Sequence, residues 1–136
     1  MKSKTTLGLA LSVVAAALFI HSAFAKTAEQ PSVTPQDVFD SMRAHFRAEK
    51  AAGLKVKYQF EITGPHGGIW SAEVNNGRCR IEKTKLEKPD VTLIASDSDW
   101  VALSNGRLSG VWAYVSGRLK IRGDQSLARK MDELFP

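Results

Sequence analysis

The feature that most constrains the fold is a change in hydrophobic period near residue 54. Before it, apolar side chains recur at helical spacing, at Val38, Phe39, Met42 and Phe46. After it, apolar and polar residues alternate through residues 54–62, which places the even-numbered side chains on one face of a strand. A helix with one apolar stripe and a strand with one apolar face bury these surfaces against each other. The sequence therefore predicts an α+β domain with helices on one face of a sheet.

The same two periods predict the other elements of the domain. Further strands are expected around residues 70–74, 79–81, 91–95 and 119–121, and further helical segments after Ser96, around 111–115 and after Asp124. Asn76-Gly77 predicts a tight hairpin between two of the strands. Thr34 is expected to cap the first helix, which we expect to end at Gly53.

The first residues are typical of an export signal. A basic start precedes the apolar run 7–20, and Ala23-Phe24-Ala25 has the small–x–small pattern of a cleavage site. The alternative is an uncleaved membrane anchor, but the run has 14 residues where a spanning helix needs about 20. We therefore expect a periplasmic or secreted protein. Its expected parts are a signal peptide (1–25), a flexible tether (26–33) and one folded domain (34–136).

Charge and chemistry narrow the possible functions. Without the two lysines of the predicted signal peptide, 17 basic residues face 14 acidic ones, a net charge of +3. This mild, interspersed charge does not indicate nucleic-acid binding, although it is compatible with transient contact with a membrane surface. Cys79 is the only cysteine, so no intramolecular disulfide forms, and we expect it to be a small buried side chain.

No motif indicates catalysis. Only His45 and His66 follow the predicted cleavage site, and no His/Cys/carboxylate group has the spacing of a metal site, so we expect neither metal nor cofactor. The glycine-rich segment 64–68 predicts a hairpin turn, because a phosphate loop leads from a strand into a helix and carries a lysine. Asp97 and Asp99 stand at a predicted helix N-terminus, where acids complement the helix dipole.

Three segments, in chain order, resemble sterol carrier protein 2 (sterol-binding) domains. They are GPHGGIWSAEVNNG (64–77), KPDVTLIASDSDW (88–100) and NGRLSGVWAYVSGRLKIRGD (105–124). The similarity spans about Thr34 to Phe135 and suggests a single-domain, exported, bacterial-type member. It implies a sterol carrier protein type fold, in which a five-stranded, mainly antiparallel sheet has helices on one face that enclose an apolar tunnel. It also implies non-enzymatic binding and carriage of a sterol, fatty acid, isoprenoid or similar apolar lipid.

The candidate tunnel lining comes from the family's tunnel and from the large apolar side chains on the predicted helices and strands. The candidates are Phe39, Met42, Phe46, Phe60, Ile62, Trp70, Trp100, Leu103, Trp112, Met131, Leu134 and Phe135. For each of them, packing in the core is the competing interpretation, and sequence does not divide the set.

Two positions depart from the family pattern, in which many relatives carry proline at position 110 and a polar residue at position 112. Gly110 loosens the start of a short helix, and Trp112 is either an anchor on the surface or a core side chain.

The alternative function is an accessory interaction module of an envelope or lipid-biosynthetic complex that carries no lipid. An enzyme whose turnover depends on His45 or His66 is a third hypothesis. The oligomeric state is left open.

Overall fold

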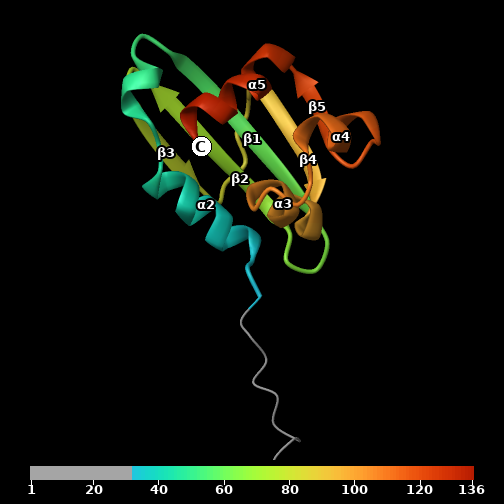
Figure 1. Cartoon of the computed structure of the whole chain (residues 1–136). Helices are drawn as coiled ribbons and strands as arrows, with labels where there is room; N and C mark the ends of the chain where they lie inside the picture. Colours follow the sequence, from blue (N-terminus) through green and yellow to red (C-terminus); the bar gives the residue numbers. More distant parts are fainter. Residues whose placement is uncertain (1–31) are drawn as a thin grey trace, which may run out of the picture. The chain divides into compact units, whose positions relative to one another are not determined.

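A five-stranded sheet with the order β3-β2-β1-β4-β5 forms the base of the computed structural model, which describes residues 32–136 (Figure 1). The strands are β1 (Lys55–Thr63), β2 (Gly68–Asn75), β3 (Arg78–Glu82), β4 (Val91–Ser96) and β5 (Lys120–Gly123). Residues Val33–Pro136 form one compact unit. The predicted signal peptide and most of the predicted tether lie outside the described residues.

The sheet is mixed, and three of its four strand pairs are antiparallel. β1 pairs antiparallel with β2, β2 with β3, and β4 with β5, whereas β1 and β4 are parallel. The predicted α+β class and the mainly antiparallel sheet are confirmed. The predicted hairpin is also present, because Asn76 and Gly77 both have positive φ, 47° and 82°, between the paired ends of β2 and β3.

Helices cover the face of the sheet that carries the alternating apolar side chains of β1 (Figure 1). They are α2 (Pro35–Ala44), the 3₁₀ turn η1 (Ala48–Ala51), α3 (Asp97–Ser104), α4 (Gly110–Val115) and α5 (Gln125–Leu134). Their starts follow local rules. Thr34 and Asp37 form a reciprocal capping box, while Ser96 and Asp124 cap α3 and α5.

The first helix is shorter than the sequence predicted. It ends at Ala44, so the predicted end at Gly53 is wrong. The intervening residues form η1 because the β2–β3 hairpin holds them. The Gly77 amide donates to the carbonyl of Ala51 at 3.1 Å, and the Gly53 amide donates to Asn76 Oδ1 at 2.9 Å. Gly53, at φ 73°, then leads the chain into β1.

An aromatic cluster joins the helices to the sheet. Phe39 of α2 stacks on Trp70 of β2 at a ring-centroid distance of 4.7 Å and on Trp100 of α3 at 5.4 Å. It also meets Phe60 of β1 edge-on at 5.1 Å. These four side chains hold α2 and α3 against one half of the sheet.

The opposite face of β1 is partly covered by the connection between β3 and β4. The Leu86 amide donates to Gln59 Oε1 at 2.8 Å, and Gln59 is buried although its side chain points away from the helices. Taken alone, the alternation of polar residues in β1 indicates a solvated face here. The crossing connection desolvates it and supplies the hydrogen bond that a buried amide requires.

Candidate functional site

A cavity of about 880 Å³ lies between the helices and the β4–β5 side of the sheet. All four α-helices contribute to it, together with Leu93 of β4 and Ile121 of β5. Its apolar wall consists of Val33, Val38, Met42, Leu93, Trp100, Leu103, Val111, Tyr114, Leu119, Ile121, Ala128, Met131, Phe135 and Pro136. The volume is within the range of about 300–1,000 Å³ that is typical of sites for a single small ligand.

The cavity is open to solvent on one side. Several residues that line it are exposed, including Ser104, Val111 and Gln125. The described structure therefore holds an apolar cavity with an open mouth, and a closed tunnel stays a prediction. No helix within residues 32–136 combines the length and apolarity needed to span a bilayer.

Polar groups at the mouth are engaged in holding helix ends. Asp37 belongs to the capping box of α2, and its hydrogen bonds with the Thr34 hydroxyl and amide lower its pKa. The Ser109 hydroxyl accepts from the Trp112 amide at 3.2 Å and so caps α4. Gln125 Nε2 of α5 donates to Tyr114 Oη of α4 at 2.9 Å, which links two helices that line the cavity.

One wall residue has an unpaired donor. Trp100 is 6% exposed, and its Nε1–H is a buried side-chain donor without a hydrogen-bond partner among the described residues. An unpaired buried donor costs about 1–3 kcal/mol.

Five of the twelve candidate residues line the cavity together. They are Met42, Trp100, Leu103, Met131 and Phe135. They come from α2, α3, α5 and the residue after α5, so the fold gathers side chains that are far apart in the sequence. Their contribution to ligand binding stays a prediction.

The other candidates lie elsewhere. Phe39, Phe60, Ile62, Trp70 and Leu134 are each at most 5% exposed and pack in the core. Phe46 is half-buried, with its ring 5.5 Å from that of Phe135. Trp112 is 60% exposed, so it is a surface side chain and the core alternative for it is wrong.

Sequence reasoning missed other parts of the wall. Val38 lies one turn before the candidate Met42 on the same stripe of α2, and Leu93 is the central apolar position of β4. Both belonged to predicted apolar faces and could have been included. Val111 and Tyr114 gave no such signal, because a six-residue helix does not reveal which side faces inward.

α4 stands apart from the other helices in how little of it is buried. Ala113 is its one buried residue, whereas Val111, Trp112, Tyr114 and Val115 are exposed. Gly110 is its first residue, and a Cβ at that position would meet no atom within 4 Å. The glycine therefore satisfies no steric requirement, and its effect on α4 is a gain in backbone freedom.

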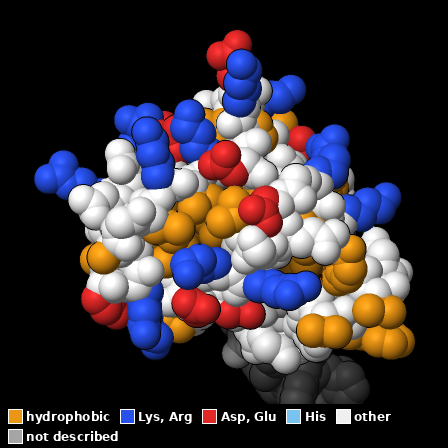
Figure 2. Space-filling model, turned by 90° about the horizontal axis from the view of Figure 1, so that it is seen from above, with side chains coloured by type: hydrophobic (Ala, Val, Ile, Leu, Met, Phe, Trp, Pro, Cys, Tyr) orange, Lys and Arg blue, Asp and Glu red, His pale blue; other side chains and the backbone are white. Residues whose placement is uncertain are grey.

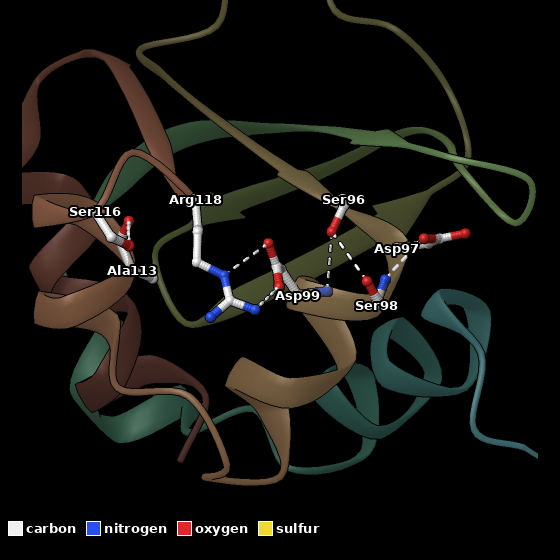
Figure 3. Close-up of polar contacts among 7 residues, drawn as sticks. All are labelled: Ser96, Asp97, Ser98, Asp99, Ala113, Ser116 and Arg118. Atoms are coloured by element: carbon white, nitrogen blue, oxygen red, sulfur yellow. Dashed lines mark hydrogen bonds and ion pairs between the residues drawn. The ribbon is translucent and has the colours of Figure 1, made fainter.

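The segment after α4 is tied to the start of α3. Figure 3 shows the Arg118 guanidinium facing the Asp99 carboxylate, with donor–acceptor distances of 2.7 and 3.3 Å. In the same view the Ser116 hydroxyl donates to the carbonyl of Ala113 at 3.3 Å, which closes the end of α4. Asp97 lies on the other side of the helix start and holds the β1–β2 turn, where it accepts from the His66 amide at 2.9 Å.

The polar side chains that catalysis could use are dispersed, except that His66 Nδ1 lies 3.6 Å from Asp97 Oδ2. Asp97 and Asp99 serve different partners, and the bond from the His66 amide lowers the pKa of Asp97. His45 is exposed at the end of α2, away from His66 in its turn. Burial raises the pKa of the Cys79 thiol to about 11, which suppresses the reactive thiolate. Within residues 32–136 no three His, Cys, Asp or Glu side chains cluster as metal ligands do.

Comparisons with known proteins point to one domain family. The model of the SCP-2 sterol transfer family matches residues 39–136 of this chain. Hydroxysteroid dehydrogenase-like protein 2 of Xenopus tropicalis is 27% identical over 112 residues, which is 82% of this chain and 27% of that protein. The chain spans about a quarter of the length of such curated relatives.

Solved structures show the same fold. The sec-alkylsulfatase Pisa1 from Pseudomonas sp. superposes with a TM-score of 0.67 and 19% identity, over 76% of this chain and 16% of that one. Palmitated SCP2L2 from Aedes aegypti superposes with a TM-score of 0.58 and 21% identity, over 74% of this chain and 93% of that one. At these identities the likeness concerns the fold alone.

Proposed function

Because this chain belongs to the SCP-2 sterol transfer family, we propose that it binds and carries one apolar lipid and is not itself an enzyme. The observation that carries the proposal is the open cavity of about 880 Å³ with a largely apolar wall. Fatty acids, sterols and isoprenoids share the chemistry it fits, namely a long apolar body with a small polar end.

The energetics favour a long ligand. Burying about ten methylene groups contributes roughly 8 kcal/mol at about 0.8 kcal/mol each. That gross gain equals the free energy of micromolar binding, before the cost of ordering the ligand and the side chains is subtracted. Useful affinity therefore requires most of a long chain or a sterol ring system inside the cavity, and short acids fall outside the proposed ligand class.

The polar groups of the site suit the small polar end. Ser104, Ser109, Gln125 and Arg129 stand among the exposed lining residues, where a hydroxyl or carboxylate can stay hydrated. The palmitated relative supports a fatty acid as one member of the class. The proposal requires no catalytic group.

The proposal includes export of the protein, with cleavage after Ala25. It rests on the basic start, the apolar run and the Ala23-Phe24-Ala25 triplet. Amino-terminal sequencing of the protein from a cell envelope or culture medium tests it, and Lys26 is the expected first residue. Recovery of the intact chain in the membrane fraction would contradict this part of the proposal.

Lipid content tests the main proposal. Native mass spectrometry of protein from its own host should show one bound lipid per chain, identified after extraction. A fluorescent fatty acid or sterol probe should then bind the delipidated protein. Persistent absence of both, together with a stable protein complex, would favour the accessory interaction module instead.

Two serines on α3 offer a matched pair of variants. Ser104 lines the cavity, whereas Ser98 is exposed on the same helix and does not line it. Ser104→Trp should place an indole at the mouth and weaken probe binding, while Ser98→Trp should leave the affinity unchanged. Equal affinities in the two variants would remove the cavity as the binding site.

A further inference from the structure

The exposed side of α4 is the most concentrated apolar surface of the described chain. The described residues include five exposed large apolar side chains, and four of them, Val111, Trp112, Tyr114 and Val115, belong to this six-residue helix. We call these four residues the α4 surface. Figure 2 shows hydrophobic side chains gathered at the side of the molecule on which α4 lies. Single exposed apolar residues are ordinary, but a contiguous group marks an interaction site.

The α4 surface is continuous with the mouth of the cavity. Val111 and Tyr114 belong to both, and Gly110 at the start of the helix also lines the cavity. A lipid that leaves the cavity beside α4 therefore passes directly over exposed apolar side chains. If a bilayer covered that surface, the lipid would move between two apolar environments without crossing water.

The charged residues around α4 indicate which kind of partner would cover the α4 surface. The 24 residues from Trp100 to Gly123 contain four basic residues and no acidic one. Arg118 and Arg122 pair with acids elsewhere in the domain. Arg107, in the connection between α3 and α4, takes part in none of the ion pairs found within residues 32–136, and it remains available to anionic groups. A basic residue close to an anionic bilayer strengthens the attachment of the protein to it.

Size argues against a protein partner. Stable protein interfaces take about 20–30 residues from each side, many more than the four side chains of the α4 surface. A bilayer needs no matching shape, and tryptophan and tyrosine favour the boundary between water and lipid. We propose that the α4 surface docks on an anionic lipid bilayer, with Trp112 inserted at the boundary. This inference rests on the proposed lipid-carrier function and names the surface through which lipid enters and leaves.

The tryptophans provide a direct measurement on the native protein. Trp70 and Trp100 are 2% and 6% exposed, so Trp112 is the tryptophan whose emission should respond to a bilayer. Vesicles of phosphatidylcholine and phosphatidylglycerol should shift the emission to shorter wavelength, and lipids brominated in their chains should quench it. Vesicles of phosphatidylcholine alone should produce a weaker response.

Three variants test the residues. Trp112→Gln should lower partitioning onto anionic vesicles by about tenfold or more, since inserting a large aromatic is worth at least the 1.4 kcal/mol of a tenfold change. Arg107→Gln should also lower it. Arg78→Gln should not, because Arg78 begins β3, at the opposite edge of the sheet from β5 and α4. All three residues are exposed, so circular dichroism should show folded proteins.

The outcomes separate this inference from the proposed function. Probe binding in solution without any response of Trp112 to anionic vesicles would overturn the docking surface and leave the carrier function standing. Vesicle binding by a protein that binds no probe would support the docking surface and overturn the carrier function. Self-association that Trp112→Gln abolishes, without vesicle binding, would show that the α4 surface meets a second copy and would overturn the proposal.

Discussion

Arg118 and Asp99 form a two-point ion pair between the segment that follows α4 and the first turn of α3. Nε and Nη2 of the arginine lie 3.3 and 2.7 Å from the two carboxylate oxygens, and the Asp99 side chain is largely buried. α3 and α4 both line the cavity, so this pair fixes the spacing of two of its walls.

Arg118→Lys should speed the release of a bound probe with little loss of stability. Lysine keeps the charge but lacks the planar fork that contacts both carboxylate oxygens, so α4 should move more freely against α3. Because the Arg118 side chain is 50% exposed, solvent screens the pair and it contributes about 1 kcal/mol or less, so the melting temperature should change little. Stopped-flow release measures the effect. Arg80→Lys, at the Glu73 pair on the far edge of the sheet, is the control, and equal release rates in both variants would contradict the prediction.

Tyr114→Phe should also accelerate probe exchange. The change removes only the hydroxyl, which accepts a hydrogen bond from Gln125 Nε2. This bond directly links the side chains of α4 and α5 at the cavity. The ring remains, so equilibrium affinity should change little while association and release both become faster. An affinity loss caused by faster release, with an unchanged association rate, would show that Tyr114 contacts the ligand and does not act as a latch.

The sequence correctly predicts those elements that are determined by residues close together in the chain. Thr34 caps α2 through a residue three positions away, and Asn76-Gly77 turns the chain because both residues adopt positive φ. The alternation in β1 likewise gives the correct inward face, with Tyr58 and Phe60 buried. Each of these features depends on neighbours in the chain, which the sequence displays directly.

The division of apolar residues between core and cavity has no local cause. Phe39 and Met42 belong to one stripe of α2, yet Phe39 stacks between Trp70 and Trp100 while Met42 lines the cavity. The difference depends on which strands and helices lie opposite each position. Gln59 shows the same limit, because its burial is caused by the connection near Leu86, 27 residues later in the chain.

Acid should destabilise the domain through three aspartates that accept hydrogen bonds. Hydrogen bonds from Thr34, His66 and Ser126 lower the pKa of Asp37, Asp97 and Asp124 respectively below the ordinary value of 3.8. A lowered folded-state pKa means that the stabilisation is complete above 3.8 and is lost as the pH falls through the folded values. Urea unfolding across this range should show a falling midpoint. Asp97→Asn should reduce the slope of the urea midpoint against pH, whereas replacement of the exposed Asp132 by Asn should leave that slope nearly unchanged. A slope that Asp97→Asn does not alter would contradict the assignment of part of the acid sensitivity to Asp97.

Replacement by alanine should affect mainly stability at one of two adjacent residues at the end of α5, and mainly probe binding at the other. Leu134 is fully buried in the core, whereas Phe135 is half-buried, lines the cavity and packs beside Phe46. Leu134→Ala should lower the free energy of unfolding by about 2–5 kcal/mol, since it leaves a void in a packed core. Phe135→Ala should cost less stability and should instead weaken probe binding.

The contrast between the two variants separates packing from ligand contact. Removing Phe135 deletes apolar wall, and at about 25 cal/mol per Å² the loss of roughly 60 Å² of contact lowers affinity about tenfold. Titration of the fluorescent probe measures this under conditions in which circular dichroism shows both variants folded. Full affinity in Phe135→Ala would remove the residue from the binding site. An affinity loss in folded Leu134→Ala that matched the loss in Phe135→Ala would instead mean that α5 acts through its position, because Leu134 has no surface in the cavity with which to contact a ligand.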